Sequence, residues 1–221
     1  MALFVQMTQR IVSNMKIIVA TRNEGKVVEI KKFFEGAAAK FGQPFSLEVL
    51  SLDDIGLDID LDAIEDGTTF EENAVKKVQA VRDALHNDEV IILADDSGLE
   101  IDAMDGLPGV DSANFMGRNT PYTVRFEHIL AQMGDKQRTA RFVAVMAIVH
   151  GGVVKTVRAT MEGEIAKEPV GTGGFGYDPI FFVPQFGKTS AELSMEQKNQ
   201  ISHRGKALMK VVEFLYENSG V

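Results

Sequence analysis

The 221-residue sequence contains no cysteine. Its absence excludes a disulfide framework, a cysteine-based zinc site and a thiol nucleophile, and it fits a cytoplasmic protein. No run approaches the ~18 apolar residues that a membrane-spanning helix needs. Positive charge is scarce as well, because 23 Lys and Arg stand against 32 Asp and Glu, for a net charge of −9. An acidic surface repels long nucleic acids, so we expect neither a nucleic-acid nor a membrane partner, while local cations could still bind a small phosphorylated substrate.

Several catalytic signatures are missing too. Neither H-x-x-x-H nor H-E-x-x-H spacing occurs, which argues against a metal site built on histidine. There is no G-x-S-x-G elbow, so a serine hydrolase of that type is disfavoured. The glycine-rich stretch 171–178 lacks the Lys-[Ser/Thr] pair of a Walker phosphate loop. We therefore look to carboxylates and cationic side chains for the chemistry.

The order of the expected elements predicts an α/β fold with a long mixed central sheet and flanking helices. These elements are strands at 16–20, 45–52, 90–94 and 179–184, helices at 70–86 and from Ser202, and a hairpin of 140–150 with 153–161. Thr120 and Pro121 are expected to cap and begin a further helix. Residues 1–14 are expected to be a flexible extension, and residues 15–221 a single catalytic domain.

The first candidate segment is TRNEGK, which follows the strand at 16–20. A tight turn into a helix leaves the first N–H groups of that helix available to an anion. Lys26 in the first turn is disfavoured by the helix dipole unless an anion lies beside it. The alternative is an ordinary strand-to-helix turn capped by Asn23.

Two carboxylates, Asp95 and Asp96, follow the expected strand 90–94. Open α/β sheets bind ligands at such strand ends, and neighbouring side chains of an extended segment point in opposite directions. One carboxylate can then bind a hard cation or deprotonate water while the other fixes the turn. The alternative is a double Asp in an Asx turn.

The segment from Ser51 to Val75 is acidic and contains no Lys or Arg. Most of its carboxylates are expected to be solvated surface or helix caps. Glu65 is the candidate for a second metal ligand, because Mg²⁺ is commonly held by one or two carboxylates together with substrate phosphates. Lys77 on the following helix is a candidate for anion binding, with solvated surface as the alternative.

Two later segments point to the other end of a substrate. The glycines of 171–178 allow the backbone to approach a flat ligand closely, and Phe175 or Tyr177 is expected to supply a stacking face, with at least one of the two in the core. His203 and Arg204 occupy the first turn of a helix, where acidic residues are normally preferred. That misfit is explained if both converge on a bound ligand; the alternative is a surface Arg and a hydrogen-bonded His.

Taken together, these segments resemble the inosine/xanthosine triphosphate pyrophosphatase family. The resemblance extends over residues 16–217 and rests on five motifs in order: Thr21-x-Asn23-x-x-Lys26, A-D-D-S-G-L (94–99), L-P-G (107–109) followed by Ser112-Ala113, G-T-G-G-F-G-Y-D-P (171–179) and I-S-H-R-G (201–205). It implies two lobes around a nucleotide-binding cleft, Mg²⁺-dependent hydrolysis of ITP, dITP or XTP to the monophosphate and pyrophosphate, and a homodimer.

The resemblance also implies a role for individual residues. Asp96 would be the general base and a magnesium ligand, with Glu65 as the second ligand and Ser97 in contact with the substrate. The triphosphate would be held by Thr21, Asn23, Lys26 and Lys77. The nucleobase end of the pocket would be formed by Phe175, Gly176, Tyr177, Asp178, Lys198, His203 and Arg204.

Two alternative functions remain open at this point. One is a nucleotide-binding module without catalysis, such as a sensor, against which the acidic pair argues. The other is a metal-dependent phosphohydrolase with a different substrate, such as modified pyrimidine nucleoside triphosphates. The order of preference among ITP, dITP and XTP does not follow from the sequence.

Overall fold

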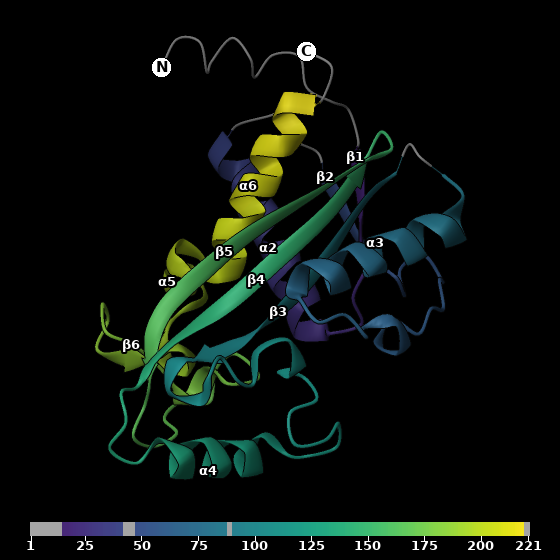
Figure 1. The fold of residues 1–221 in the computed structure, drawn as a ribbon. Coiled ribbons are helices and arrows are strands. Elements are labelled where there is room, and N and C mark those ends of the chain that lie inside the picture. The colour runs from purple at the N-terminus through teal and green to yellow at the C-terminus, as the bar shows by residue number, and fades with distance from the viewer. Residues whose placement is uncertain (1–14, 42–46, 88–89, 219–221) are drawn as a thin grey trace. The chain divides into compact units, whose positions relative to one another are not determined.

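The computed structural model describes residues 15–41, 47–87 and 90–218. Its strands form one seven-stranded sheet in the order β2-β1-β3-β4-β5-β6-β7 (Figure 1). Parallel and antiparallel pairs both occur in it. The expected α/β fold with a mixed sheet is therefore confirmed.

The parallel part of the sheet is built from the first three strands. β1 (Met15–Val19) pairs with β2 (Leu47–Ser51) on one side and with β3 (Ile91–Ile101) on the other. β3 is buried along almost its entire length, as expected for a central strand covered on both faces. The prediction that this strand ends at Ala94 is wrong, because it continues through the Asp-Asp-Ser-Gly segment without a turn.

The antiparallel part is a long hairpin followed by two short strands. β4 (Thr139–His150) and β5 (Val153–Ile165) lie side by side in Figure 1 and are joined by Gly151 and Gly152, whose φ angles of +55° and +78° suit glycine. β6 (Phe181–Val183) and β7 (Lys188–Thr189) continue the sheet. The predicted hairpin is confirmed.

The chain divides into two compact units. Among the described residues, unit 1 comprises those within 15–95, 145–157 and 207–218, and unit 2 comprises residues 96–144 and 158–206. The core of unit 1 includes Ile17 on β1, Ile30 and Phe34 on α2 (Glu24–Phe41), and one face of α3 (Phe70–Leu85). Thr69 caps α3 by accepting the N–H of Glu72.

Unit 2 has its own hydrophobic core. Its helices are α4 (Tyr122–Met133), α5 (Met195–Ile201) and the first turn of α6 (His203–Asn218). The buried residues that pack together include Leu99 and Ile101 of β3, Ile129 of α4, Phe142 of β4 and Phe181 of β6.

Short 3-10 helices complete the described elements: η1 (Asp62–Ile64), η2 (Asp102–Met104), η3 (Gly109–Asp111), η4 (Asp178–Ile180) and η5 (Ser190–Glu192).

One predicted helix start is wrong. Thr120 does not cap α4, since the helix begins at Tyr122 with Pro121 as its N-cap residue. Instead the Thr120 hydroxyl donates to the carbonyl of Met116 at 2.7 Å.

Two other expectations concern the limits of the described chain. The extension expected over residues 1–14 lies outside the described residues, and the single domain over 15–221 stays a prediction. No helix in the described ranges combines the length and the apolarity needed to cross a membrane.

Candidate active site

The turn between β1 and α2 is held by the side chains of Thr21 and Asn23. Thr21 Oγ1 accepts the N–H of Asn23 at 3.2 Å, and Asn23 Oδ1 accepts the N–H of Lys26 at 3.1 Å. The capping role of Asn23 is therefore confirmed, and it satisfies one of the N–H groups that a helix start leaves open.

Lys26 and Lys77 converge on Asp95 within unit 1. Lys77 Nζ donates to the main-chain carbonyl of Asp95 at 2.7 Å, and Lys26 Nζ lies 3.4 Å from the same oxygen. Lys26 Nζ is also 3.4 Å from Asp95 Oδ2, and the Asp95 side chain is fully buried. The structure thus brings together two ammonium groups that the sequence separates by 51 positions.

Lys77 is buried rather than solvated, so the surface alternative for this residue is wrong. Its ammonium group also forms a 2.8 Å ion pair with Glu65 Oε1 from the acidic segment. Glu65 is thereby held beside the lysine pair. The ion pair involves only one of the two Glu65 carboxylate oxygens. The role of Glu65 as a metal ligand stays a prediction.

The acidic pair lies within β3. Both residues are buried, Asp95 fully and Asp96 with 6% of its surface exposed. In an extended strand their side chains point to opposite faces, and Asp95 is the one that pairs with Lys26. The Asx-turn alternative is wrong because the segment is a continuous strand. The assignment of Asp96 as general base stays a prediction.

In unit 2 the ring of Phe175 lies near two cations. Lys198 Nζ is 5.3 Å and Arg204 Cζ is 5.5 Å from the ring centroid, both within cation–π range. Lys198 comes from α5, whose N-terminus is fixed by a capping box of Ser194 and Gln197, and Arg204 comes from the first turn of α6. The Phe175 side chain is half-buried, so it combines an accessible aromatic surface with adjacent donors.

Asp178 and Ser97 hold these cations in place. Lys198 Nζ binds Asp178 Oδ2 at 2.8 Å, and the same oxygen accepts the backbone N–H of Phe175 at 2.9 Å. Arg204 Nη2 donates to the Ser97 hydroxyl at 3.1 Å. Five residues predicted for the substrate site are thus brought together in unit 2.

Two other predicted site residues lie in the core of unit 2. Tyr177 is 3% exposed and donates its hydroxyl to the carbonyl of Ser112 at 2.9 Å, and burial raises the pKa of this phenol to about 12. The ring of His203 stacks on Phe142 with centroids 5.0 Å apart. Of the two aromatics considered for stacking, Phe175 is therefore the accessible one.

The glycines of this loop have identifiable roles. Gly174 and Gly176 have φ angles of +72° and +62°, a region that residues with a Cβ rarely occupy. A Cβ on Gly174 would collide with the Asp178 carboxylate. Glycine at 174 is thus what allows Asp178 to reach the Phe175 backbone.

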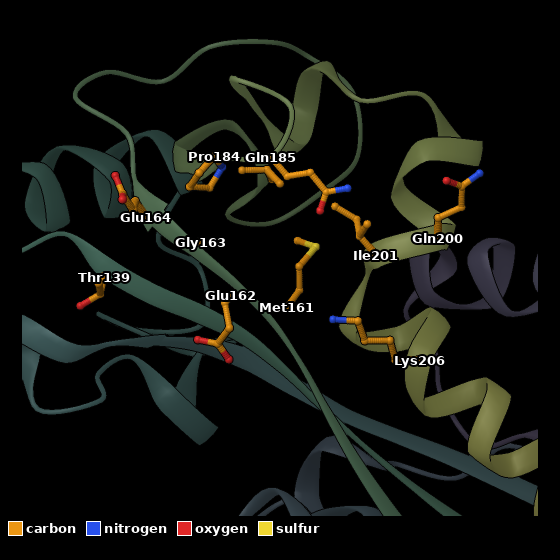
Figure 2. Close-up of a pocket in the computed structure, with 11 residues that line it drawn as sticks. Thr139, Met161, Glu162, Gly163, Glu164, Pro184, Gln185, Gln200, Ile201 and Lys206 are labelled. Atoms are coloured by element: carbon orange, nitrogen blue, oxygen red, sulfur yellow. The ribbon is translucent and has the colours of Figure 1, made fainter.

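A cavity of about 540 Å³ lies elsewhere in unit 2 (Figure 2). Its lining residues include Met161, Ile201, Glu162, Glu164 and Lys206. None of the predicted site residues lines it. The Glu162 carboxylate pairs with Arg141, which is not among the lining residues, and the cavity does not replace the predicted site.

The donor set of the predicted site suits Mg²⁺. Magnesium takes oxygen ligands, retains several waters, and is held by one or two carboxylates together with substrate phosphates. Within the described ranges no group of three or more His, Asp and Glu residues forms a metal cage. Asp96 and Glu65 each carry carboxylate oxygens of the type that Mg²⁺ prefers, and their assignment as its ligands stays a prediction.

Two features around these residues were not predicted from the sequence. The carbonyl of Asp95 anchors both lysines, but a main-chain acceptor has no residue-type signature. Arg125 is buried and donates to four main-chain carbonyls of the 112–118 loop. An apolar helix face that includes an arginine was the available signal for it, since a buried charge requires partners.

Comparison with known proteins identifies relatives along most of the chain. The model of the Ham1 family matches residues 17–214. The dITP/XTP pyrophosphatase of Bacillus subtilis (strain 168) is 43% identical over 202 residues, which cover 90% of this chain and 96% of that protein. The dITP/XTP pyrophosphatase of Geobacillus kaustophilus is 45% identical over 202 residues, covering 90% and 93%.

Solved structures agree. The Staphylococcus aureus Ham1 protein superimposes with a TM-score of 0.75 at 39% identity, covering 90% of this chain and 97% of that one. A HAM1 protein from Coxiella burnetii has a TM-score of 0.74 at 33% identity, covering 92% and 99%. The resemblance inferred from the five motifs is therefore confirmed: the chain belongs to the Ham1 family.

Proposed function

We propose that this chain hydrolyses the deaminated purine nucleotides dITP, ITP and XTP between the α- and β-phosphates, releasing the monophosphate and pyrophosphate. The single structural observation that carries the proposal is the Phe175 ring with Lys198 and Arg204 both within cation–π distance of it. The substrate class comes from the names of the relatives. Such an enzyme would remove deaminated purines from the nucleotide pool.

The aromatic ring and its cations account for binding of a 6-oxo purine. Stacking of a base on an aromatic side chain contributes about 1–3 kcal/mol in single-strand binding proteins. Arg204, Lys198 and backbone N–H groups offer donors to O6. The 6-amino group of adenine would leave such donors unsatisfied, and that kind of mismatch can be worth several orders of magnitude in discrimination.

The triphosphate is assigned to unit 1. Lys26 and Lys77 supply the positive charge, and their shared contact with Asp95 holds both ammonium groups before substrate arrives. Thr21 and Asn23 shape the preceding turn. Preorganised cations of this kind stabilise charge that develops in the transition state without reorganisation at the moment of reaction.

Asp96 is assigned as the general base. Its carboxylate takes a proton from the attacking water as the water oxygen bonds to phosphorus and pyrophosphate leaves. Mg²⁺, for which Asp96 and Glu65 are the proposed ligands, supplies neutralisation of the phosphate charge and polarisation of the phosphorus centre when it is bound. On the same resemblance we propose a homodimer located in the cytoplasm.

The test is pyrophosphate release measured across ITP, dITP, XTP, ATP, GTP and modified pyrimidine triphosphates, each with Mg²⁺ and with EDTA. We expect Mg²⁺-dependent turnover of the first three and little turnover of ATP or GTP. Tight ITP binding without pyrophosphate release would instead indicate a binding module. Faster turnover of a modified pyrimidine nucleotide would overturn the purine assignment. Light scattering after gel filtration tests the dimer.

A further inference from the structure

Arg125 on α4 is an almost completely buried cation, with 2% of its surface exposed. Its Nη1 donates to the carbonyls of Ser112 and Ala113 at 3.1 and 2.9 Å. Its Nη2 donates to the carbonyls of Gly117 and Arg118 at 3.0 and 3.5 Å. All four of these acceptors are main-chain carbonyls of the 112–118 loop.

The Ser112 carbonyl is shared with the base-side segment. The Tyr177 hydroxyl donates to it at 2.9 Å, so Arg125 and Tyr177 fix the same oxygen. Tyr177 is two residues from Phe175 in the sequence, and the backbone between them includes Gly176 at positive φ. A shift of the Ser112 carbonyl therefore displaces the anchor of the segment that carries the Phe175 ring.

Ser112 also connects Arg125 to β3. The Ser112 hydroxyl accepts the backbone N–H of Leu99 at 2.9 Å. Leu99 lies two residues after Ser97, whose hydroxyl accepts a hydrogen bond from Arg204. Both the strand that carries Ser97 and the segment that carries Phe175 are thus tied to the residue that Arg125 fixes.

A second route runs through aromatic rings. The Arg125 guanidinium lies over the ring of Tyr122, 4.7 Å from its centroid. Tyr122 in turn contacts Tyr177 edge-on at 5.2 Å. Arg125 therefore supports Tyr177 at its hydroxyl, through Ser112, and at its ring, through Tyr122.

We propose that Arg125 is a positioning residue for the nucleobase end of the substrate site, acting through the Ser112 carbonyl and Tyr177 on the Phe175 ring. The planar fork of a guanidinium suits this task, because it reaches four carbonyls in a fixed geometry that a lysine ammonium cannot match. The inference rests on the proposed function, since its readout is nucleotide binding, and it adds a residue outside the site predicted from the sequence.

The test is the Arg125→Met variant, assayed for pyrophosphate release from XTP and dITP. We expect KM to rise about tenfold for both, equivalent to part of one base-stacking contact, with kcat changed by less than about threefold. Arg125→Lys keeps the charge with fewer carbonyl bonds and is expected to raise KM only about threefold. Hydrogen exchange should become faster in residues 112–118 and 175–178 of the Met variant.

The matched control is Arg141→Met, which removes another unit 2 arginine. Arg141 binds the carboxylates of Glu100, Asp102 and Glu162, none of which is assigned to the site. We expect KM to stay unchanged in this variant. Equal KM increases in both Met variants, or unchanged KM in a folded Arg125→Met protein, would overturn the positioning role.

A double-mutant cycle keeps the proposal testable if Arg125→Met does not fold. Arg125→Lys and Tyr177→Phe weaken bonds to the same Ser112 carbonyl, so their effects on KM are expected to be non-additive. Additive effects would contradict the proposed route. A wild-type protein that releases no pyrophosphate from any nucleotide contradicts the proposed function instead, and hydrogen exchange in 175–178 would still report on Arg125.

Discussion

The ammonium group of Lys198 lies 2.8 Å from Oδ2 of Asp178, and both side chains are almost completely buried, with 6% and 4% exposed. The same oxygen accepts the backbone N–H of Phe175. Asp178 thus orients a cation and fixes the loop beside it. This makes Asp178 an organising residue of the base-side cluster, whether or not it touches the substrate.

Asp178→Asn should be strongly destabilising, because it removes the charge that balances a buried lysine. Breaking a buried ion pair from one side costs about 3–5 kcal/mol. The amide oxygen can still accept from Phe175, so the loss reports mainly on the charge. We expect a free energy of unfolding in urea that is lower by that amount.

The matched control is Glu48→Gln, which breaks the exposed pair with Lys16, where the side chains are 58% and 54% exposed for Lys16 and Glu48. An exposed pair contributes about 0–1 kcal/mol. Similar losses in the two variants would show that the Asp178 pair has no special role in stability.

Alanine substitutions at Gly174 and Gly187 separate the steric cost of an added Cβ from the backbone cost of a positive φ. Gly174→Ala is expected to displace the Asp178 carboxylate, since the added Cβ would overlap Oδ2 at a φ of +72°. Gly187 has a similar φ of +63° but open space around the added Cβ. Gly187→Ala should therefore cost only the left-handed backbone penalty, about 1–2 kcal/mol.

We expect Gly174→Ala to be destabilised more than Gly187→Ala and to raise KM for XTP, while Gly187→Ala leaves KM unchanged. Thermal unfolding and steady-state pyrophosphate release measure the two effects. Equal stability losses with unchanged KM would mean that the loop accommodates the methyl group and that Asp178 does not require glycine there.

The sequence was sufficient to predict the fold class and most elements, because burial and chain reversal have local signatures. The hairpin followed from two apolar runs separated by Gly151 and Gly152. The end of β3 was not predictable in this way. Asp95, Asp96, Ser97 and Gly98 favour turns by local propensity, and the sheet neighbours on both sides override that preference.

The residue types at the candidate site were predictable, but their contacts were not. Lys77 was a candidate for anion binding with solvated surface as the alternative, and the pattern could not show that it is buried against a main-chain carbonyl. Tyr177 and Phe175 could not be separated by pattern, because both precede the same strand. Only packing shows that Tyr177 faces the core while Phe175 is accessible.

Asp96→Asn tests the assigned base. The amide cannot take a proton from water at neutral pH, so we expect kcat for XTP to fall by about 10²–10⁴-fold. Far-UV circular dichroism should be unchanged, because Asn is nearly isosteric with Asp. A variant with intact structure and the full rate would exclude Asp96 as the base.

The buried phenol of Tyr177 predicts a loss of stability at alkaline pH. Burial raises its pKa from 10.0 to about 12, so the folded state keeps the proton that the unfolded state loses near pH 10. The resulting stabilisation is complete below pH 10 and is lost as the pH rises toward 12, by up to about 3 kcal/mol.

The Tyr177→Phe variant tests this prediction, because it has no phenolic proton to lose. At pH 8 the variant should be slightly less stable than the wild type, because it lacks the hydrogen bond to the Ser112 carbonyl. The difference in free energy of unfolding between the two proteins should shrink as the pH rises and reverse sign by pH 11.5. Urea unfolding of both proteins at each pH, with tyrosinate absorbance at 295 nm as a second readout, measures it. A stability difference that stays constant across this range would contradict the raised pKa of Tyr177.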